Sequence, residues 1–124
     1  MYPYTYPRSY APAGGGTVDF TVGGTDSTPP VFEIYGLCVS PVIELASTGE
    51  QIRINGTVDA GTYLEIDVDA REVRLADGTV RNNLFDFETS TWFDLPPGPQ
   101  QLSLAASSFD EDAFLRVRYR SAYA

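Results

Sequence analysis

Short stretches of this sequence alternate apolar and polar residues with a period of two. In residues 62–68, for example, Leu64, Ile66 and Val68 alternate with polar or aromatic residues. This alternation is typical of a β-strand with one buried face, and turn-forming residues such as Gly, Pro and Asp separate the stretches. The pattern predicts an all-β fold with strands at residues 17–22, 31–35, 37–45, 51–55, 62–68, 71–75, 91–95, 101–104 and 114–119.

About nine short strands at regular spacing indicate an antiparallel β-sandwich or barrel. The 124 residues are enough for one domain with one core. Pro41 lies inside the stretch 37–45, so that strand is expected at an edge or at a bulge. Residues 80–88 hold Leu84, Phe85 and Phe87 among polar residues, which indicates a loop with aromatic plugs or one helical turn.

The first 16 residues, MYPYTYPRSYAPAGGG, have a different composition from the rest. Proline fixes φ and removes backbone donors, so this segment is expected to be extended and unable to form a central strand. We predict a Tyr/Pro-rich arm with a glycine linker at residues 1–16 and a sandwich domain at residues 17–124. The candidate assembly residues of the arm are Tyr2, Tyr4, Tyr6, Arg8 and Tyr10.

The charge is strongly acidic, with 17 Asp and Glu residues against eight basic ones and a net charge of -9. All eight basic residues are arginines. Such a surface repels phosphate backbones, so no nucleic-acid partner is expected. The apolar runs are far shorter than the ~18 residues of a membrane span, and the N-terminus has no signal-peptide core, so no membrane partner is expected either.

The residue types for catalysis are scarce because the chain has no His and no Lys. Cys38 has no base to activate it, so we interpret it as a small buried hydrophobic residue. Glu65, Asp67 and Asp69 share one strand face and have the spacing for a carboxylate pair or a calcium ion. We favour instead a solvated face that pairs with Arg53, Arg71 and Arg74 across neighbouring strands.

The acidic run at residues 110–112 lacks the ligand spacing of an EF-hand and is interpreted as a turn. The glycines at positions 14–16 lack the spacing of a phosphate-binding loop and are interpreted as a hinge. We therefore predict no catalytic residues, no metal, no cofactor and no enzymatic activity.

Trp92 is the chain's single tryptophan, in the stretch STWFDLPPGPQQLSL at residues 90–104. In a strand over 91–95, Phe93 and Leu95 share the inward side and Trp92 points outward. An outward tryptophan needs a cover, and three covers are open: a sugar, the loop 80–88, or another subunit. As an alternative function, the candidate glycan contacts are Trp92, Tyr63 and Tyr119.

An ordered set of short runs resembles a known family. The runs are YPYTYP (2–7), PVFEIYG (30–36), GEQI (49–52), GTYLEID (61–67), REVRL (71–75), STWFDLPPG (90–98) and VRYRSAY (117–123). Together they resemble the C-terminal domain of siphophage distal tail and minor tail proteins, especially those of phages that infect actinobacteria. The resemblance implies a galectin-like or jelly-roll-like β-sandwich and a structural role in the tail. It also implies that the run LPPG is a corner between strands.

The resemblance implies a place in the virion tail, synthesis in the bacterial host cytoplasm, and other phage tail proteins as partners. A homo-oligomer within a symmetric assembly is expected. The alternative is a carbohydrate-binding module that recognises a glycan of the host surface. Family members usually carry an N-terminal half that builds the ring around the tail tube. This chain starts with Met1 at the preceding linker, so we expect a standalone tail product or a peripheral module held by its arm.

Overall fold

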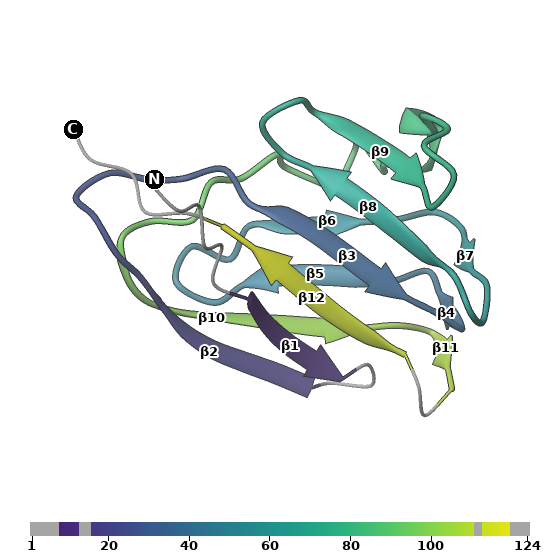
Figure 1. The fold of residues 1–124 in the computed structure, drawn as a ribbon, viewed down its shortest axis with the longest axis horizontal. Coiled ribbons are helices and arrows are strands. Elements are labelled where there is room, and N and C mark those ends of the chain that lie inside the picture. The colour runs from purple at the N-terminus through teal and green to yellow at the C-terminus, as the bar shows by residue number, and fades with distance from the viewer. Residues whose placement is uncertain (1–7, 13–15, 111–112, 120–124) are drawn as a thin grey trace.

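The computed structural model describes residues 8–12, 16–110 and 113–119, and these residues form an all-β fold (Figure 1). Every regular element in this part of the chain is a strand, apart from one 3₁₀ turn, η1 (Asn82–Leu84). Within the described ranges, no helix has the length and apolarity needed to cross a membrane. The all-β prediction is confirmed.

Five strands form one antiparallel sheet in the order β1-β12-β3-β8-β9. Strand β3 lies at the centre of this sheet, between β12 and β8, so strands that are distant in sequence are direct neighbours. Their bounds are Arg8–Pro12 for β1, Phe114–Arg118 for β12, Val31–Tyr35 for β3, Tyr63–Asp67 for β8 and Glu72–Leu75 for β9.

A second antiparallel sheet has the order β2-β10-β5-β6, and a small third sheet has the order β11-β4-β7. The four-stranded sheet consists of β2 (Gly16–Val22), β10 (Gly98–Ala105), β5 (Val42–Leu45) and β6 (Gln51–Arg53). The three-stranded sheet consists of β11 (Ser108–Phe109), β4 (Cys38–Val39) and β7 (Thr57–Val58).

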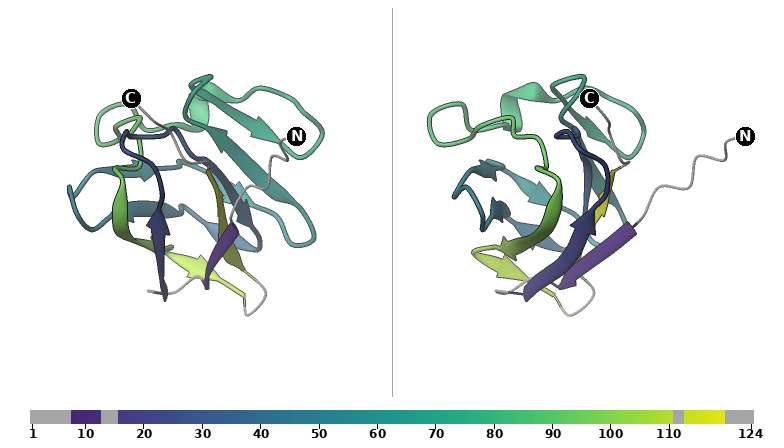
Figure 2. Two further views of the ribbon diagram at one scale, coloured as in Figure 1. Left: turned by 60° about the vertical axis from the view of Figure 1, so that its left-hand side comes forward. Right: turned by 90° about the vertical axis from the view of Figure 1, so that its left-hand side faces the viewer.

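The two larger sheets lie face to face, as the turned views in Figure 2 show, and their inward side chains form one hydrophobic cluster. From the five-stranded sheet this cluster receives Phe32, Ile34, Leu64, Ile66, Val73, Leu115 and Val117. From the four-stranded sheet it receives Val22, Ile43, Leu45, Ile52, Leu102 and Leu104. One shared core between two antiparallel sheets makes the fold a β-sandwich, as predicted.

Pro41 separates β4 from β5, so the apolar stretch 37–45 is divided between two sheets. The LPPG corner is also present, because β10 begins at Gly98, whose φ is 99° and whose position suits glycine. Gln100 stabilises this corner, since its side-chain amide donates to the Pro96 carbonyl at 3.1 Å and accepts from the Ser47 hydroxyl at 2.8 Å.

The prediction of a strand at residues 91–95 is wrong, because these residues form no strand, but the predicted inward side chains are confirmed. Phe93 and Leu95 are buried, but only Leu95 forms a bridge, to Thr28. The segment that reaches β6 is held by single hydrogen bonds, such as Thr91 N–H to the Gln51 carbonyl at 2.9 Å, instead of a continuous ladder. The alternation of apolar and polar residues therefore predicts which side chains are buried here, although the segment does not pair as a strand.

Part of the predicted arm is paired in the sandwich. Strand β1 forms the edge of the five-stranded sheet, with Arg8 opposite Arg118 and Pro12 opposite Phe114. A proline-containing strand is compatible with an edge, where one row of backbone groups needs no partner. Residues 1–7 and 13–15 lie outside the described residues, so the boundary between arm and sandwich stays a prediction.

Candidate functional site

Three aromatic residues form a row across the outer face of the five-stranded sheet. The register places Phe114 opposite Tyr35 and Tyr35 opposite Tyr63, on strands β12, β3 and β8. The rings of Tyr35 and Phe114 are stacked, with centroids 4.4 Å apart, and those of Tyr35 and Tyr63 are tilted at 5.2 Å. All three side chains are half-buried. This aromatic row presents part of its surface to solvent.

A ladder of charged residues lies beside the aromatic row on the same face. Glu33 is only 7% exposed and lies 3.3 Å from Arg116 and 3.4 Å from Arg118. Arg118 also contacts Glu65 at 3.3 Å, and Arg74 contacts Glu65 at 2.7 Å. Tyr35 donates its hydroxyl proton to Glu33 at 3.1 Å, and burial is the main cause that raises the pKa of this phenol.

The predicted pairing of Glu65 and Asp67 is confirmed for one of the three proposed arginines. Arg74 contacts both carboxylates and also pairs with Glu72. The prediction is wrong for Arg53, which lies on β6 of the opposite sheet and cannot face this ladder. Asp69 and Arg71 are exposed in the turn that joins β8 and β9.

Replacing Glu33 with glutamine is expected to lower the free energy of unfolding by about 2 kcal/mol, because two partly buried guanidinium groups lose their carboxylate. The Nε atoms of Arg116 and Arg118 are already buried without a hydrogen-bond partner, and Arg118 would keep its contact with Glu65. Urea unfolding measures the change. Glu72→Gln, at a more exposed position, is the control and should cost less than about 0.5 kcal/mol. Equal effects would contradict the assignment.

Trp92 is covered by the loop 80–88, one of the three covers left open by the sequence. Its ring stacks on Phe85 with centroids 4.0 Å apart and planes at 7°. Phe85 is buried, and Phe87, which is 65% exposed, meets it edge-on at 4.9 Å. The sequence left open a loop with aromatic plugs or one helical turn at residues 80–88, and the structure has both, since Phe85 is buried and η1 is one 3₁₀ turn.

Tyr119 is not an exposed aromatic residue. It is 5% exposed, packs on Phe20 with centroids 5.1 Å apart, and donates its hydroxyl proton to the Thr21 carbonyl at 3.4 Å. Burial raises the pKa of this phenol. Trp92, Tyr63 and Tyr119 thus contact three different sets of neighbours, and the structure does not bring them together into one site.

Of the candidate arm residues, Tyr2, Tyr4 and Tyr6 lie outside the described residues. The backbones of Arg8 and Tyr10 lie in β1, opposite Arg118 and Arg116.

Cys38 is fully buried, as its interpretation as a small hydrophobic residue predicts. Burial, and then the negative charge of Asp110, raise the pKa of its thiol to about 11. The thiol is therefore protonated at neutral pH and is a poor nucleophile. The described residues contain no group of three or more side chains that could hold a metal ion.

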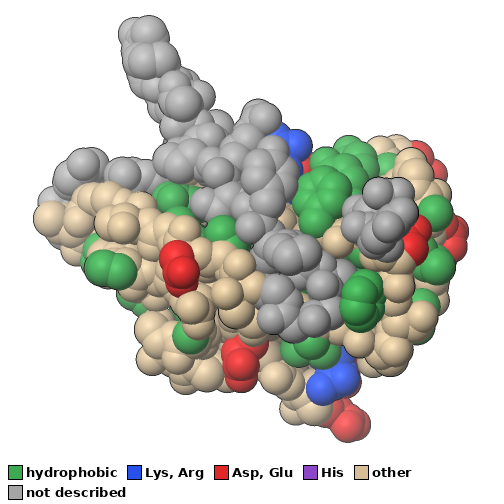
Figure 3. Space-filling view, turned by 90° about the horizontal axis from the view of Figure 1, so that it is seen from below, with side chains coloured by type: hydrophobic (Ala, Val, Ile, Leu, Met, Phe, Trp, Pro, Cys, Tyr) green, Lys and Arg blue, Asp and Glu red, His purple; other side chains and the backbone are tan. Residues whose placement is uncertain are grey.

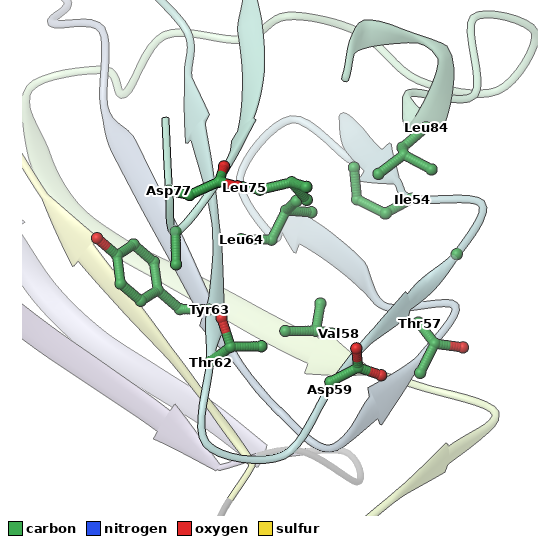
Figure 4. Close-up of a pocket in the computed structure, with 12 residues that line it drawn as sticks. Ile54, Thr57, Val58, Asp59, Thr62, Tyr63, Leu64, Leu75, Asp77 and Leu84 are labelled. Carbon is green, nitrogen blue, oxygen red and sulfur yellow. The ribbon is translucent and has the colours of Figure 1, made fainter. Parts of the chain in front are cut away.

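A pocket of about 270 Å³ opens at one end of the sandwich, between β8 and β9 on one side and Ile54, β7 and η1 on the other (Figure 4). Leu64, Leu75 and Ile54 point toward one another in its interior, and Asp59 and Asp77 contribute carboxylates (Figure 4). Sequence reasoning missed this pocket, because its lining comes from four stretches, at residues 54–59, 62–64, 75–77 and 84, and shows no local pattern.

The sequence matches the family model described as the siphovirus-type tail component, C-terminal domain, over residues 23–123. This match covers most of the chain and every strand of the two large sheets except β1 and β2, which precede residue 23. The chain belongs to this family. The family is that of a siphovirus-type tail component, so this tail-component domain is a structural part of a phage tail in the virion. The predicted structural role and location are confirmed.

A solved structure supports the same fold for this tail-component domain. The crystal structure of the Dit protein of phage SPP1 matches with a TM-score of 0.68 and 11% sequence identity. That protein is described as a paradigm of the hub adsorption apparatus in phages that infect Gram-positive bacteria. The alignment covers 93% of this chain but 47% of the SPP1 protein, so the chain spans about half the length of that relative. No curated protein matches the sequence.

Proposed function

We propose that the tail-component domain docks onto neighbouring tail proteins through the outer face of its five-stranded sheet. The half-buried aromatic row of Phe114, Tyr35 and Tyr63 is the observation that carries this proposal. Aromatic side chains are enriched in protein interfaces and supply much of their binding energy. The adjacent charged residues already pair with one another, so a partner can cover them without leaving those carboxylates unpaired.

The domain is further proposed to self-associate within a symmetric tail through its N-terminal arm. The arm has Tyr2, Tyr4, Tyr6 and Tyr10 within ten residues, with Arg8 as its cation. Tyrosine provides a large apolar contact area and a hydrogen-bond donor. The prolines restrict the free chain, so less conformational entropy is lost when the arm is ordered against a neighbour.

Glycan binding is a second candidate, and a shallow hollow beside the aromatic row favours it. The hollow has a volume of about 300 Å³ and is lined by Tyr35, Gly36, Ala60, Gly61, Thr62, Asp110 and Phe114. Aromatic rings next to hydroxyl and carboxylate oxygens offer the stacking and hydrogen bonding that a sugar requires. The same face could therefore recognise a host-surface glycan instead of a protein.

One experiment separates these two roles: a phage that carries Tyr63→Ala and Phe114→Ala together in this gene. If the row docks onto tail proteins, the variant protein should fall at least about tenfold in purified virions, since two aromatic contacts are lost. Quantitative mass spectrometry of virions measures its content. Phe109→Ala, which removes an exposed phenylalanine from β11, is the matched control and should leave incorporation unchanged.

Normal incorporation with reduced adsorption to host cells would instead support the glycan role. Normal incorporation with normal adsorption would reject both roles for this face. The purified variant must keep the wild-type melting temperature, so that loss of incorporation is not loss of folding.

A further inference from the structure

The pocket between the two sheets combines an apolar interior with an acidic rim. Ile54, Val58, Leu64, Leu75 and Leu84 line the interior, and Asp59 and Asp77 are the charged residues of the lining. No arginine is among the lining residues. In the space-filling view from below, Arg side chains are sparse and hydrophobic side chains lie in separate patches (Figure 3). The pocket thus offers hydrocarbon contacts together with hydrogen-bond acceptors.

The two carboxylates are available to a partner. Asp59 is exposed and has no side-chain hydrogen bond or ion pair within the described part of the chain. Asp77 accepts the Thr79 backbone N–H at 2.9 Å with one oxygen. Hydrogen bonds from Thr79 lower the pKa of Asp77, so its carboxylate is ionised at neutral pH. A complementary occupant has an apolar body and a donor group at its end.

The aliphatic lining and the modest volume of the pocket suit a single side chain better than an oligosaccharide. Sites for drug-sized ligands have volumes of roughly 300–1,000 Å³, whereas this pocket has about 270 Å³. An oligosaccharide also requires several polar partners, and the interior of this pocket is made of aliphatic side chains. One aromatic side chain with a terminal hydroxyl fits both the volume and the acidic rim.

We infer that this pocket receives a tyrosine from the N-terminal arm of a second copy of the chain. The inference rests on the proposed self-association through the arm and adds the place where the arm binds. A tyrosine of the run YPYTYP would bury its ring against Leu64 and Leu75 and donate its hydroxyl proton to Asp59 or Asp77. Arg8 adds a positive charge to an arm that faces an acidic domain.

The geometry of the sheet favours a second copy over the same copy. Arg8 and Tyr63 lie three strands and about four residues apart, which corresponds to about 20 Å across the sheet. The pocket lies on the inner side of the sheet, so an arm would also have to pass around strand β9. Residues 1–7 span at most about 24 Å when fully extended. An arm from an adjacent copy avoids this path.

The test is a double-mutant cycle on the self-association of the full chain. Sedimentation equilibrium measures the association constant of each variant. Ala76→Trp places a large ring at the mouth of the pocket, from an exposed lining position. Replacing Tyr2, Tyr4 and Tyr6 together with serine removes the anchors. Each change alone should weaken association about tenfold or more. The combined variant should be no weaker than the worse of the two, because both changes remove the same contact.

A rim variant tests the same pocket with little risk to folding. Asp59→Asn combined with Asp77→Asn removes both charges and replaces Asp-Gly at residues 77–78 with Asn-Gly, which a tight turn also tolerates. Association should weaken several-fold. Asp69→Asn removes an exposed charge outside the pocket and should leave association unchanged. A synthetic peptide of residues 1–10 should compete with the arm in the wild-type chain and should not bind Ala76→Trp.

Three results would overturn the inference: a wild-type chain that stays monomeric up to millimolar concentration, additive effects in the cycle, or peptide binding that survives Ala76→Trp. Additive effects would reject the pocket and leave arm-mediated self-association standing. A monomeric chain would reject self-association itself. Neither result bears on the aromatic row, whose role is measured separately by incorporation into virions.

Discussion

Replacing Gly36 with alanine is expected to lower the free energy of unfolding by about 3 kcal/mol or more. Gly36 is buried immediately after β3, where its N–H donates to the Thr62 carbonyl at 3.2 Å and its backbone pairs with Ala60. A Cβ atom at Gly36 would overlap the backbone carbonyl oxygens of Val58 and Asp59. Backbone atoms cannot turn aside like the end of a side chain, so the chain itself must shift.

Urea unfolding of Gly36→Ala measures this loss, and the melting temperature should fall by about 10 °C or more. Gly56→Ala is the matched control, because a Cβ at Gly56 would meet only the tip of the Leu84 side chain, at 3.2 Å. That side chain can move, so the control should lose less than about 1 kcal/mol. Similar losses for the two variants would show that the segment near Val58 yields more easily than its packing indicates.

Phe93→Ala is expected to cost about 3–5 kcal/mol, which is the usual range for a phenylalanine deleted from a packed core. Phe93 is 1% exposed and packs on Phe32 of β3 with ring centroids 5.6 Å apart. Its own segment is not a strand and has few backbone hydrogen bonds to neighbours. The ring is therefore a main anchor that holds this segment between the two sheets.

Phe87→Ala is the control for this deletion, because Phe87 is 65% exposed and lies in the neighbouring loop. Its removal should change the free energy of unfolding by less than about 1 kcal/mol. Stability is again measured by urea unfolding, and tryptophan fluorescence reports whether Trp92 keeps its environment. If Phe93→Ala unfolds like the control, the segment at residues 91–95 is held mainly by Leu95 and its bridge to Thr28.

The strands with clear alternation could be predicted from the sequence, and the irregular segments could not. Residues 31–35 form β3 as predicted, because Phe32 and Ile34 meet a complementary face in the core. Residues 91–95 show the same alternation but form no strand. A strand requires a neighbour with free backbone groups, and the sequence of one segment does not contain that neighbour.

The candidate sites show the same division. The partial exposure of Tyr63 could be predicted from its place on a strand. The prediction that Tyr119 is exposed is wrong, because Phe20 covers it from a strand distant in sequence. The cover of Trp92 was left open, and Phe85 provides it. The aromatic row of Phe114, Tyr35 and Tyr63 depends on a register among three strands from different parts of the chain.

The sequence by itself determined the all-β class, the inward side chains of most strands, the acidic charge and the resemblance to the tail-component family. These properties follow from local periodicity, composition and short runs. The tertiary structure decided the sheet order, the ion pairs around Glu33, the pocket at Asp59 and Asp77, and the cover of Trp92. Each of these requires segments far apart in the chain to meet, and that meeting is set by how the two sheets share one core.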